Sequence, residues 1–193
     1  MNVALRQPQM SREQFLDWAA RREERYEFDG LQPVAMTGGT RNHNRIIVNA
    51  LTALQSRLRG TPCEALGLDA GIATVGDAVR YPDVVVSCSP TTGESRLIAA
   101  PVVVCEVVSP TSARTDRIIK LREYASVPTI LRYVILEYSY IGASVLARRT
   151  GNDPFAATAL TAEDMLVLPE LGIEIPLAAL YEDVVFPAAP DDA

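Results

Sequence analysis

The segment PVVVCEVVSP, residues 101–110, contains one charged residue, Glu106, within an almost continuous apolar run. A run of this length and composition is typical of a buried β-strand. An ionised carboxylate in such a strand is unfavourable unless it is paired with a cation, hydrogen-bonded or bound to a metal ion. The segment therefore predicts a core strand and requires a partner for Glu106.

Strand and helix patterns alternate on both sides of this segment. Ser11 and Gln14 have the spacing of a capping box, which predicts a helix from residue 11 to about residue 25. Asp29-Gly30 lies between two short apolar-containing runs and predicts a hairpin. Apolar residues at helical spacing predict a long helix within 40–60. Further strands are expected at about 64–74, 79–88, 100–108, 130–140 and 143–149, a short helix at 115–125, and a short strand followed by a helical turn in 171–184.

This order of elements favours an α/β (α+β) fold in which a mixed central β-sheet is flanked by helices. We expect one domain over residues 11–182, with a flexible arm at 1–10 and a flexible tail at 183–193. The length of 193 residues is sufficient for one sizeable core.

The net charge of −6 argues mildly against strong nonspecific binding of nucleic acid, because proteins with that task are more often basic. No apolar run is long enough to predict a membrane span, and the N-terminus lacks the apolar core of a signal peptide.

The cysteine pattern indicates a reducing compartment. The chain has three cysteines, and none forms a CxxC pair. Cys88 and Cys105 lie in apolar segments, where a free thiol behaves as a small hydrophobic residue. A zinc site is improbable with a single histidine. We therefore expect a cytoplasmic protein.

Two carboxylates in apolar strands suggest a metal site. Asp83 precedes a run of three valines, and Glu106 lies in the next strand. If these strands are neighbours, the two carboxylates can meet at one end of the sheet, where Mg²⁺ would relieve their repulsion. That arrangement suits metal-assisted hydrolysis of a phosphodiester. In the structural alternative, Asp83 starts a strand and Glu106 pairs with an arginine in a salt bridge.

Lys120 is the third candidate. Asp116, Lys120 and Tyr124 are four residues apart and share one helix face. One interpretation is an exposed Asp116–Lys120 pair worth roughly 0.3–0.5 kcal/mol. In the other, the Lys120 ammonium lies near the metal and stabilises developing negative charge.

These residues carry a resemblance to a known family. The sequence resembles the Uma-two family of restriction endonucleases, within the PD-(D/E)XK nuclease superfamily, over about residues 11–182. Each motif is short, but their order and spacing along strand, strand and helix make the set specific. The motifs are Tyr26-Glu27, Asp29-Gly30, His43-Asn44, Pro82-Asp83-Val84, Glu106-Val107-Val108-Ser109-Pro110, Asp116 with Lys120 and Tyr124, and VPTILRYVIL.

The resemblance implies a restriction-endonuclease-like core and a catalytic site. Asp83 and Glu106 would be the Mg²⁺ ligands, with Mn²⁺ as a substitute, and Glu27 would be an acidic residue beside the metal. The sequence departs from the superfamily pattern at Val108, where the catalytic lysine is expected. The family resembles superfamily members in which this lysine has moved to the following helix, and Lys120 matches that position.

Two further residues are candidates for substrate binding. His43 is the only histidine, and the resemblance implies that it contacts a phosphate or a metal-bound water. Its structural alternative is a polar residue in the first turn of a helix. Arg80, three residues before Asp83, is a candidate phosphate contact or a solvated surface charge.

We therefore expect a Mg²⁺-dependent endonuclease that hydrolyses DNA. One alternative is a catalytically inactive binding or assembly module that keeps the nuclease fold, which Val108 and the acidic net charge favour. The other is a metal-dependent phosphoesterase of a small substrate. Fold analogy also predicts a homodimer, with the apolar strands near 131–147 as its interface.

Overall fold

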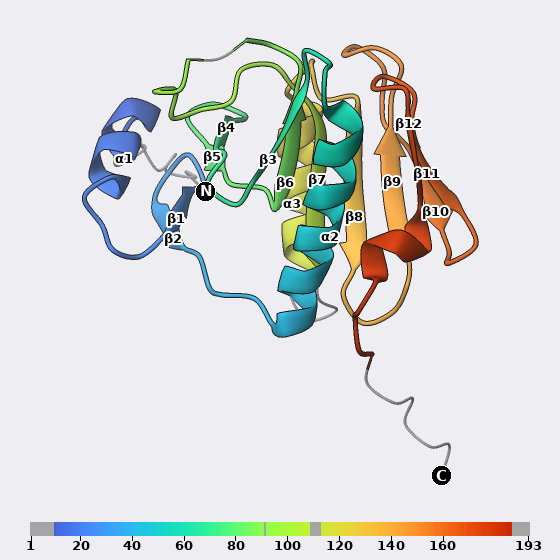
Figure 1. Cartoon of the computed structure of the whole chain (residues 1–193). Helices are drawn as coiled ribbons and strands as arrows, with labels where there is room; N and C mark the ends of the chain where they lie inside the picture. The colour runs from blue at the N-terminus through green and yellow to red at the C-terminus, as the bar shows by residue number, and fades with distance from the viewer. Residues whose placement is uncertain (1–9, 91, 109–112, 187–193) are drawn as a thin grey trace, which may run out of the picture.

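The segment around Glu106 forms β7 (Pro101–Val108), which lies inside a six-stranded sheet in the computed structural model (Figure 1). The strand order is β10-β9-β8-β7-β6-β3, and only β7 and β8 run parallel among neighbours. The predicted mixed central sheet is confirmed. Its other strands are β3 (Glu64–Gly67), β6 (Val84–Ser87), β8 (Arg132–Glu137), β9 (Ala143–Ala147) and β10 (Ala156–Leu160).

The structure describes residues 10–90, 92–108 and 113–186, with backbone only for residues 113–117. Most of the predicted arm at 1–10, part of the predicted tail at 183–193 and the side chain of Asp116 lie outside the described residues. No helix in the described part of the chain is long and apolar enough to cross a membrane.

Helices cover both faces of the sheet. In Figure 1, α2 (Arg41–Leu58) lies in front of the sheet and α3 (Ala113–Ala125) lies behind it. Buried α2 side chains such as Ile46 and Leu54 share one core cluster with Val103 of β7. On the opposite face, Tyr124 of α3 packs in a second cluster with Val104. Because α3 connects the parallel strands β7 and β8, it forms the crossover that parallel pairing requires.

The N-terminal segment forms a smaller layer beside the main sheet. α1 (Arg12–Ala19) begins with the predicted capping box at Ser11, but it ends well before residue 25. The charged run RREER at 21–25 has no apolar side to bury, and short helices depend on such packing. The predicted hairpin is present as β1 (Tyr26–Phe28) and β2 (Pro33–Ala35). They form a four-stranded sheet with β4 (Ile72–Ala73) and β5 (Val79–Arg80), in the order β2-β1-β5-β4.

The C-terminal segment adds elements that the sequence only partly predicts. β11 (Met165–Leu168) and β12 (Ile173–Pro176) form a hairpin, followed by the 3₁₀ helix η1 (Leu177–Tyr181), which packs against the α2 face of the core. β12 and η1 match the predicted strand and helical turn at 171–184. β10 and β11 were not predicted. The segment AATAL of β10 has no apolar alternation, because its first four residues are all exposed.

The strands near 131–147, predicted as a dimer interface, lie inside the main sheet. β8 is almost entirely buried, and it lies between β7 and β9. β9 is in turn covered along its other edge by β10. Strands inside a sheet have no free edge, so an interface in this segment would not form by edge pairing, and the homodimer stays a prediction.

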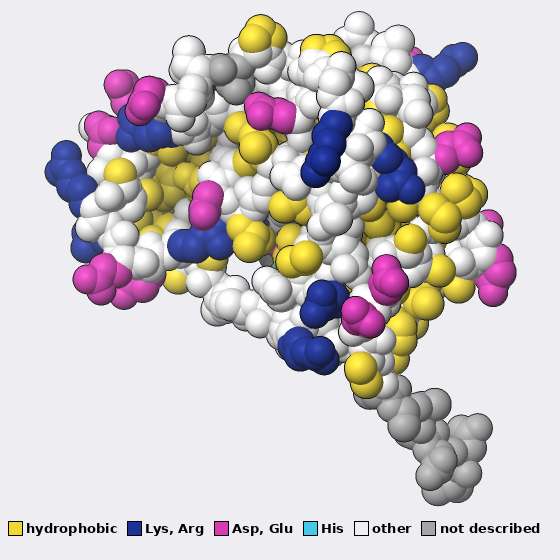
Figure 2. All heavy atoms as spheres, viewed as in Figure 1, with side chains coloured by type: hydrophobic (Ala, Val, Ile, Leu, Met, Phe, Trp, Pro, Cys, Tyr) yellow, Lys and Arg dark blue, Asp and Glu magenta, His cyan; other side chains and the backbone are white. Residues whose placement is uncertain are grey.

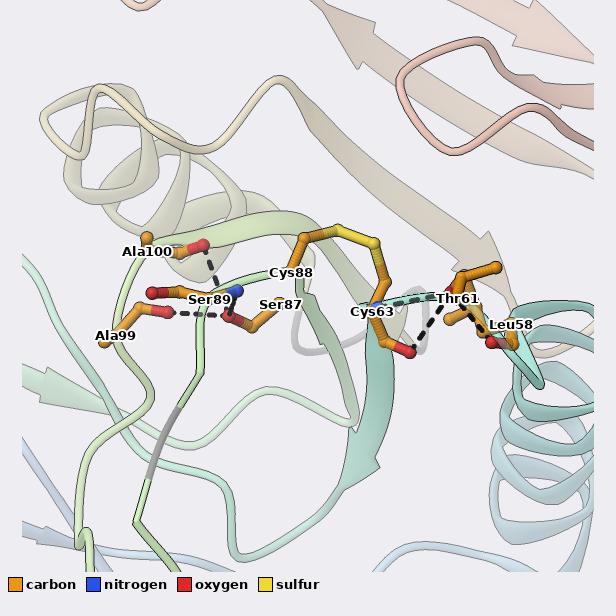
Figure 3. The surroundings of a disulfide bond; sticks show 8 residues. All are labelled: Leu58, Thr61, Cys63, Ser87, Cys88, Ser89, Ala99 and Ala100. Atoms are coloured by element: carbon orange, nitrogen blue, oxygen red, sulfur yellow. Dashed lines mark hydrogen bonds between the residues drawn. A yellow bond between two sulfur atoms is a disulfide. The ribbon is translucent and has the colours of Figure 1, made fainter.

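A disulfide joins Cys63 to Cys88, as Figure 3 shows. Glu64 of β3 pairs with Ser87 of β6, so the two cysteines are the next residues of an antiparallel pair, with Cα atoms 3.8 Å apart. The prediction that Cys88 is a free thiol is therefore wrong, because strand pairing brings together residues 25 apart in sequence. Cys105 is free and buried, as predicted. Disulfides are rare in reducing compartments, so the cysteines no longer support the cytoplasmic assignment.

Candidate active site

Residues from several elements line one cleft of about 430 Å³. The cleft is lined by residues of β1, β2, β5, β7, β8, α3 and the first turn of α2, together with Asp83 directly before β6. This cleft brings together all six residues that the sequence singled out: Glu27, His43, Arg80, Asp83, Glu106 and Lys120.

In the described part of the chain, Glu106 has two hydrogen-bond partners, and both come from α3. Its Oε1 atom accepts a hydrogen bond from Lys120 Nζ at 2.9 Å and another from the hydroxyl of Tyr124 at 2.6 Å. Glu106 is 5% exposed. Burial raises the pKa of the Glu106 carboxyl, while the charge of Lys120 lowers it. The carboxylate is thus kept in the core by a cation and a hydroxyl rather than by the arginine that the structural alternative proposed.

Lys120 is the only lysine in the sequence. Its Nζ atom lies between two carboxylates, 2.9 Å from Glu106 Oε1 and 3.6 Å from Glu27 Oε1. Burial alone would lower the pKa of Lys120, but Glu106 and Glu27 outweigh it, so the pKa is raised and the group stays an ammonium. Lys120 of α3 therefore reaches the carboxylate of Glu106 on the neighbouring strand. The Lys120 side chain is 20% exposed and lines the cleft, while the predicted pair with Asp116 lies outside the described residues.

Asp83 lies directly before β6 and reaches across to β7. Its Oδ2 atom accepts a hydrogen bond of 2.7 Å from the backbone N–H of Val107. Asp83 is 9% exposed, and burial raises the pKa of its carboxyl to about 6, although the hydrogen bond from Val107 opposes the shift. Glu106 is the residue before Val107, so this bond ties the two predicted metal ligands together across neighbouring antiparallel strands.

Glu27 of β1 is held by hydrogen bonds from β5 and the residue that follows it. The backbone N–H of Tyr81 donates to Glu27 Oε1 at 3.2 Å, and Arg80 Nη1 donates to Glu27 Oε2 at 3.0 Å. Arg80 also makes a two-point contact with Glu123 of α3, at 2.6 Å and 2.7 Å.

This geometry corrects the role predicted for Arg80. The residue is 6% exposed, and its guanidinium bridges Glu27 and Glu123. Burial opposes the charge of Arg80, but the two carboxylates outweigh it and raise its pKa. Arg80 therefore positions Glu27 in the cleft, and the geometry does not favour the predicted phosphate contact.

His43 lies in the first turn of α2, where its backbone N–H donates to the N-cap side chain of Thr40 at 3.2 Å. Its Nε2 atom is 3.5 Å from Asp83 Oδ2. Burial lowers the pKa of the imidazole, so the neutral form is favoured near pH 7. The ring packs against Gly39, since a Cβ atom at that position would collide with it. The histidine thus faces the candidate metal ligand rather than bulk solvent.

The donor set fits a Mg²⁺ ion whose remaining ligands come from water and substrate. Asp83 and Glu106 line one cleft, and the charge of Asp83 further raises the pKa of Glu106. Among the described residues, hydrogen bonds are donated to Oδ2 of Asp83 and Oε1 of Glu106, and none is donated to the second oxygen of either carboxylate. Within the described residues, no three or more His, Cys, Asp or Glu side chains form a cluster that could hold a metal by themselves. Mg²⁺ commonly uses only one or two carboxylates.

Two supporting residues were not predicted as part of the site. Tyr124 was noted only as a member of the Lys120 face, and that spacing of four residues was the available signal for its contact with Glu106. Glu123 gave no sequence signal, because its partner Arg80 is 43 residues away.

Comparisons with known proteins agree with this fold. A family model described as "Uma2: Putative restriction endonuclease" matches residues 12–178. An uncharacterized protein of Synechocystis sp. is 30% identical over 181 residues, which cover 93% of this chain and 95% of the relative. The crystal structure of "a putative nuclease belonging to DUF820" from Anabaena variabilis matches with a TM-score of 0.72 and 14% identity, over 91% of this chain and 99% of that chain.

Proposed function

Since this chain belongs to the Uma2 family, we propose that it is a Mg²⁺-dependent endonuclease that hydrolyses DNA phosphodiester bonds. The family description and the fold shared with the Anabaena nuclease support a nuclease in general. The observation that carries the proposal is the position of Lys120, whose ammonium is held between Glu106 and Glu27 in the cleft that contains Asp83.

Each residue of the cleft has a distinct task in this proposal. Asp83 and Glu106 would hold Mg²⁺ or Mn²⁺. A bound Mg²⁺ ion supplies Lewis-acid polarisation of the phosphoryl group and lowers the pKa of a water molecule. Lys120 stabilises negative charge that develops on the phosphoryl oxygens, because it is a cation in a partly dehydrated site. Glu27, as the second carboxylate near Lys120, helps to orient its ammonium.

His43 is the candidate contact to the substrate phosphate. Its Nε2 atom lies 3.5 Å from Asp83, so the imidazole can donate a hydrogen bond to a group bound beside that carboxylate. Arg80 acts indirectly, by holding Glu27.

The non-catalytic alternative also draws on the structure. Lys120 neutralises Glu106 without a metal, as a structural ion pair would. The two proposals make different predictions for the second oxygen of Asp83 and of Glu106. In a nuclease these oxygens would bind a cation, and in a binding module they would not.

Calorimetric titration with Mg²⁺ and Mn²⁺ tests the metal site directly. We expect wild-type protein to bind the cation, and Asp83→Asn and Glu106→Gln to lose the binding. Glu174→Gln, an exposed carboxylate on β12, is the matched control and should bind normally. In a cleavage assay on plasmid DNA, with EDTA as the blank, wild type and Glu174→Gln should cleave the DNA. Asp83→Asn and Glu106→Gln should not. Metal binding without DNA cleavage, combined with hydrolysis of a small phosphodiester, would favour the phosphoesterase alternative. No metal binding and no cleavage would favour the binding module.

A further inference from the structure

A second cavity of about 300 Å³ adjoins the cleft, between α1, the hairpin strand β1 and the loops around residues 69 and 96. The two cavities share Met36 and Tyr81 in their walls. The backbone N–H of Tyr81 donates to Glu27 in the cleft, and Tyr81 also lines the second cavity. An occupant of the second cavity would therefore lie beside the groups proposed to act on the scissile phosphate.

The inner wall of this cavity is apolar and aromatic. Leu16 of α1, Tyr26 of β1 and Met36 line it together with Tyr81. Tyr26 is fixed by an edge-on contact with Trp18, with ring centroids 4.8 Å apart. Such walls suit a flat ring that stacks or packs edge-on. Figure 2 shows hydrophobic side chains in the hollow beside α1, with charged side chains around it.

The rim of the cavity carries balanced charge. Three arginines and three carboxylates line it: Arg22, Arg25, Arg96, Glu23, Glu24 and Asp69. Two of the arginines are already paired, Arg25 with Asp69 at 3.0 Å and Arg96 with Asp17 at 2.7 Å. A phosphate would not be favoured over such a neutral rim. A neutral ring with hydrogen-bonding edges would be favoured at this rim. The exposed ion pairs are weak, so their side chains can form hydrogen bonds with the ring instead.

We propose that this cavity, the base pocket, takes one unstacked nucleobase of the DNA strand whose phosphate lies in the cleft. The proposal rests on the proposed function, because the strand is delivered by the catalytic cleft. A nucleobase is a neutral aromatic ring with donor and acceptor edges, and it matches both the wall and the rim. A base can enter such a pocket only after it leaves the helical stack, so the preferred substrate is single-stranded or locally unpaired DNA.

Trp18 provides a direct readout of the base pocket. It is the only tryptophan in the chain, and it contacts Tyr26 and Arg22, which both line the pocket. We would titrate protein in EDTA with a short single-stranded oligodeoxynucleotide, and follow both anisotropy of a label on the DNA and emission of Trp18. EDTA prevents metal-dependent cleavage during the measurement.

Ala20→Phe is the test variant, because Ala20 is exposed at the C-cap of α1 and lines the pocket. A larger side chain there fills the cavity without removing a core contact. Ala179→Phe, on the exposed side of η1, is the matched control. We expect Ala20→Phe to weaken oligonucleotide binding at least about fivefold, as loss of one base–aromatic contact does, and to suppress the change in Trp18 emission. Ala179→Phe should behave as wild type.

A second arm uses wild-type protein alone and does not depend on the folding of a variant. Oligonucleotides in which one nucleotide at a time is abasic should show one position whose base is needed for the Trp18 signal and for full affinity. Equal affinity and an equal Trp18 signal for every abasic position would overturn the proposal, and so would wild-type binding by Ala20→Phe.

The same experiments separate this proposal from the proposed function. If wild type cleaves DNA and Ala20→Phe binds and cleaves equally well, the base pocket is wrong and the nuclease stands. If wild type does not cleave, but binds single-stranded DNA with a signal that Ala20→Phe loses, the base pocket stands and the nuclease is wrong.

Discussion

The ammonium of Lys120 on helix α3 lies 2.9 Å from Oε1 of Glu106 on strand β7. Val108, which shares the strand face of Glu106, cannot supply a cation. The helix α3 packs on that same face and places Lys120 over the carboxylate. Lys120 of α3 therefore supplies the positive charge that was expected from a lysine at the position of Val108.

Replacement of Lys120 by methionine should abolish most of the nuclease activity. The variant Lys120→Met keeps the length of the side chain but removes the only cation between Glu106 and Glu27. We expect the single-turnover cleavage rate to fall by about 10²–10³-fold, the usual effect of one lost electrostatic contact to a transition state. Arg122→Met, at an exposed position of the same helix, is the control. Equal rates for both variants would exclude a catalytic role for Lys120.

Asp83 should destabilise the metal-free protein at neutral pH. Burial raises the pKa of its carboxyl from 3.8 to about 6, so the folded state binds more protons than the unfolded state between these values. The free energy of unfolding should therefore fall as pH rises from about 4 to about 6 and stay level above that. In urea with EDTA at pH 8, Asp83→Asn should be more stable than wild type, on the order of 2–3 kcal/mol. Asp77→Asn, outside the cleft, should leave stability unchanged, and a destabilised Asp83→Asn would contradict the argument.

The bridge between Arg80 and Glu123 should contribute strongly to stability. Glu123→Gln removes a buried charge and leaves Arg80 with Glu27 as its remaining carboxylate. Removing one partner of a buried pair costs about 3–5 kcal/mol, and urea unfolding can measure this loss. Asp69→Asn breaks the exposed pair with Arg25 and should cost less than about 1 kcal/mol. If the two substitutions have similar effects, the bridge does not hold the layer that carries Glu27.

Loss of the Cys63–Cys88 disulfide should lower stability without changing the cleft. The bond closes a loop with a sequence separation of 25 residues, which corresponds to about 3 kcal/mol from restriction of the unfolded chain. Cys63→Ser combined with Cys88→Ser should therefore unfold at lower urea concentration while it binds metal as wild type does. Cys105→Ser alone serves as the comparison, because that thiol is free. A reducing agent should reproduce the effect in wild type and have none in the double variant.

The main residues of the candidate site could be predicted from the sequence, because their unusual placement is visible from the residues next to them. Glu106 was conspicuous as a carboxylate among valines, and Asp83 stood before a second apolar strand. Such placements are unfavourable without a partner, so they can be recognised before any contact is known. Lys120 and Tyr124 followed from their shared helix face. The partners of Arg80 had no comparable signal, because Glu27 and Glu123 lie 53 and 43 residues away.

The sequence by itself determined the alternation of strands and helices, the capping box of α1 and the hairpin after Phe28. It also determined which acidic residues the core must accommodate. These depend on periodicity, capping and turn chemistry within a few residues. Only the tertiary structure decided which strands are neighbours. Strand pairing joined Cys63 to Cys88 and placed β10 along the edge of β9. The packing of β1 and α3 around β5 gave Arg80 its two carboxylates. These contacts depend on the closure of long chain segments, which no local pattern specifies.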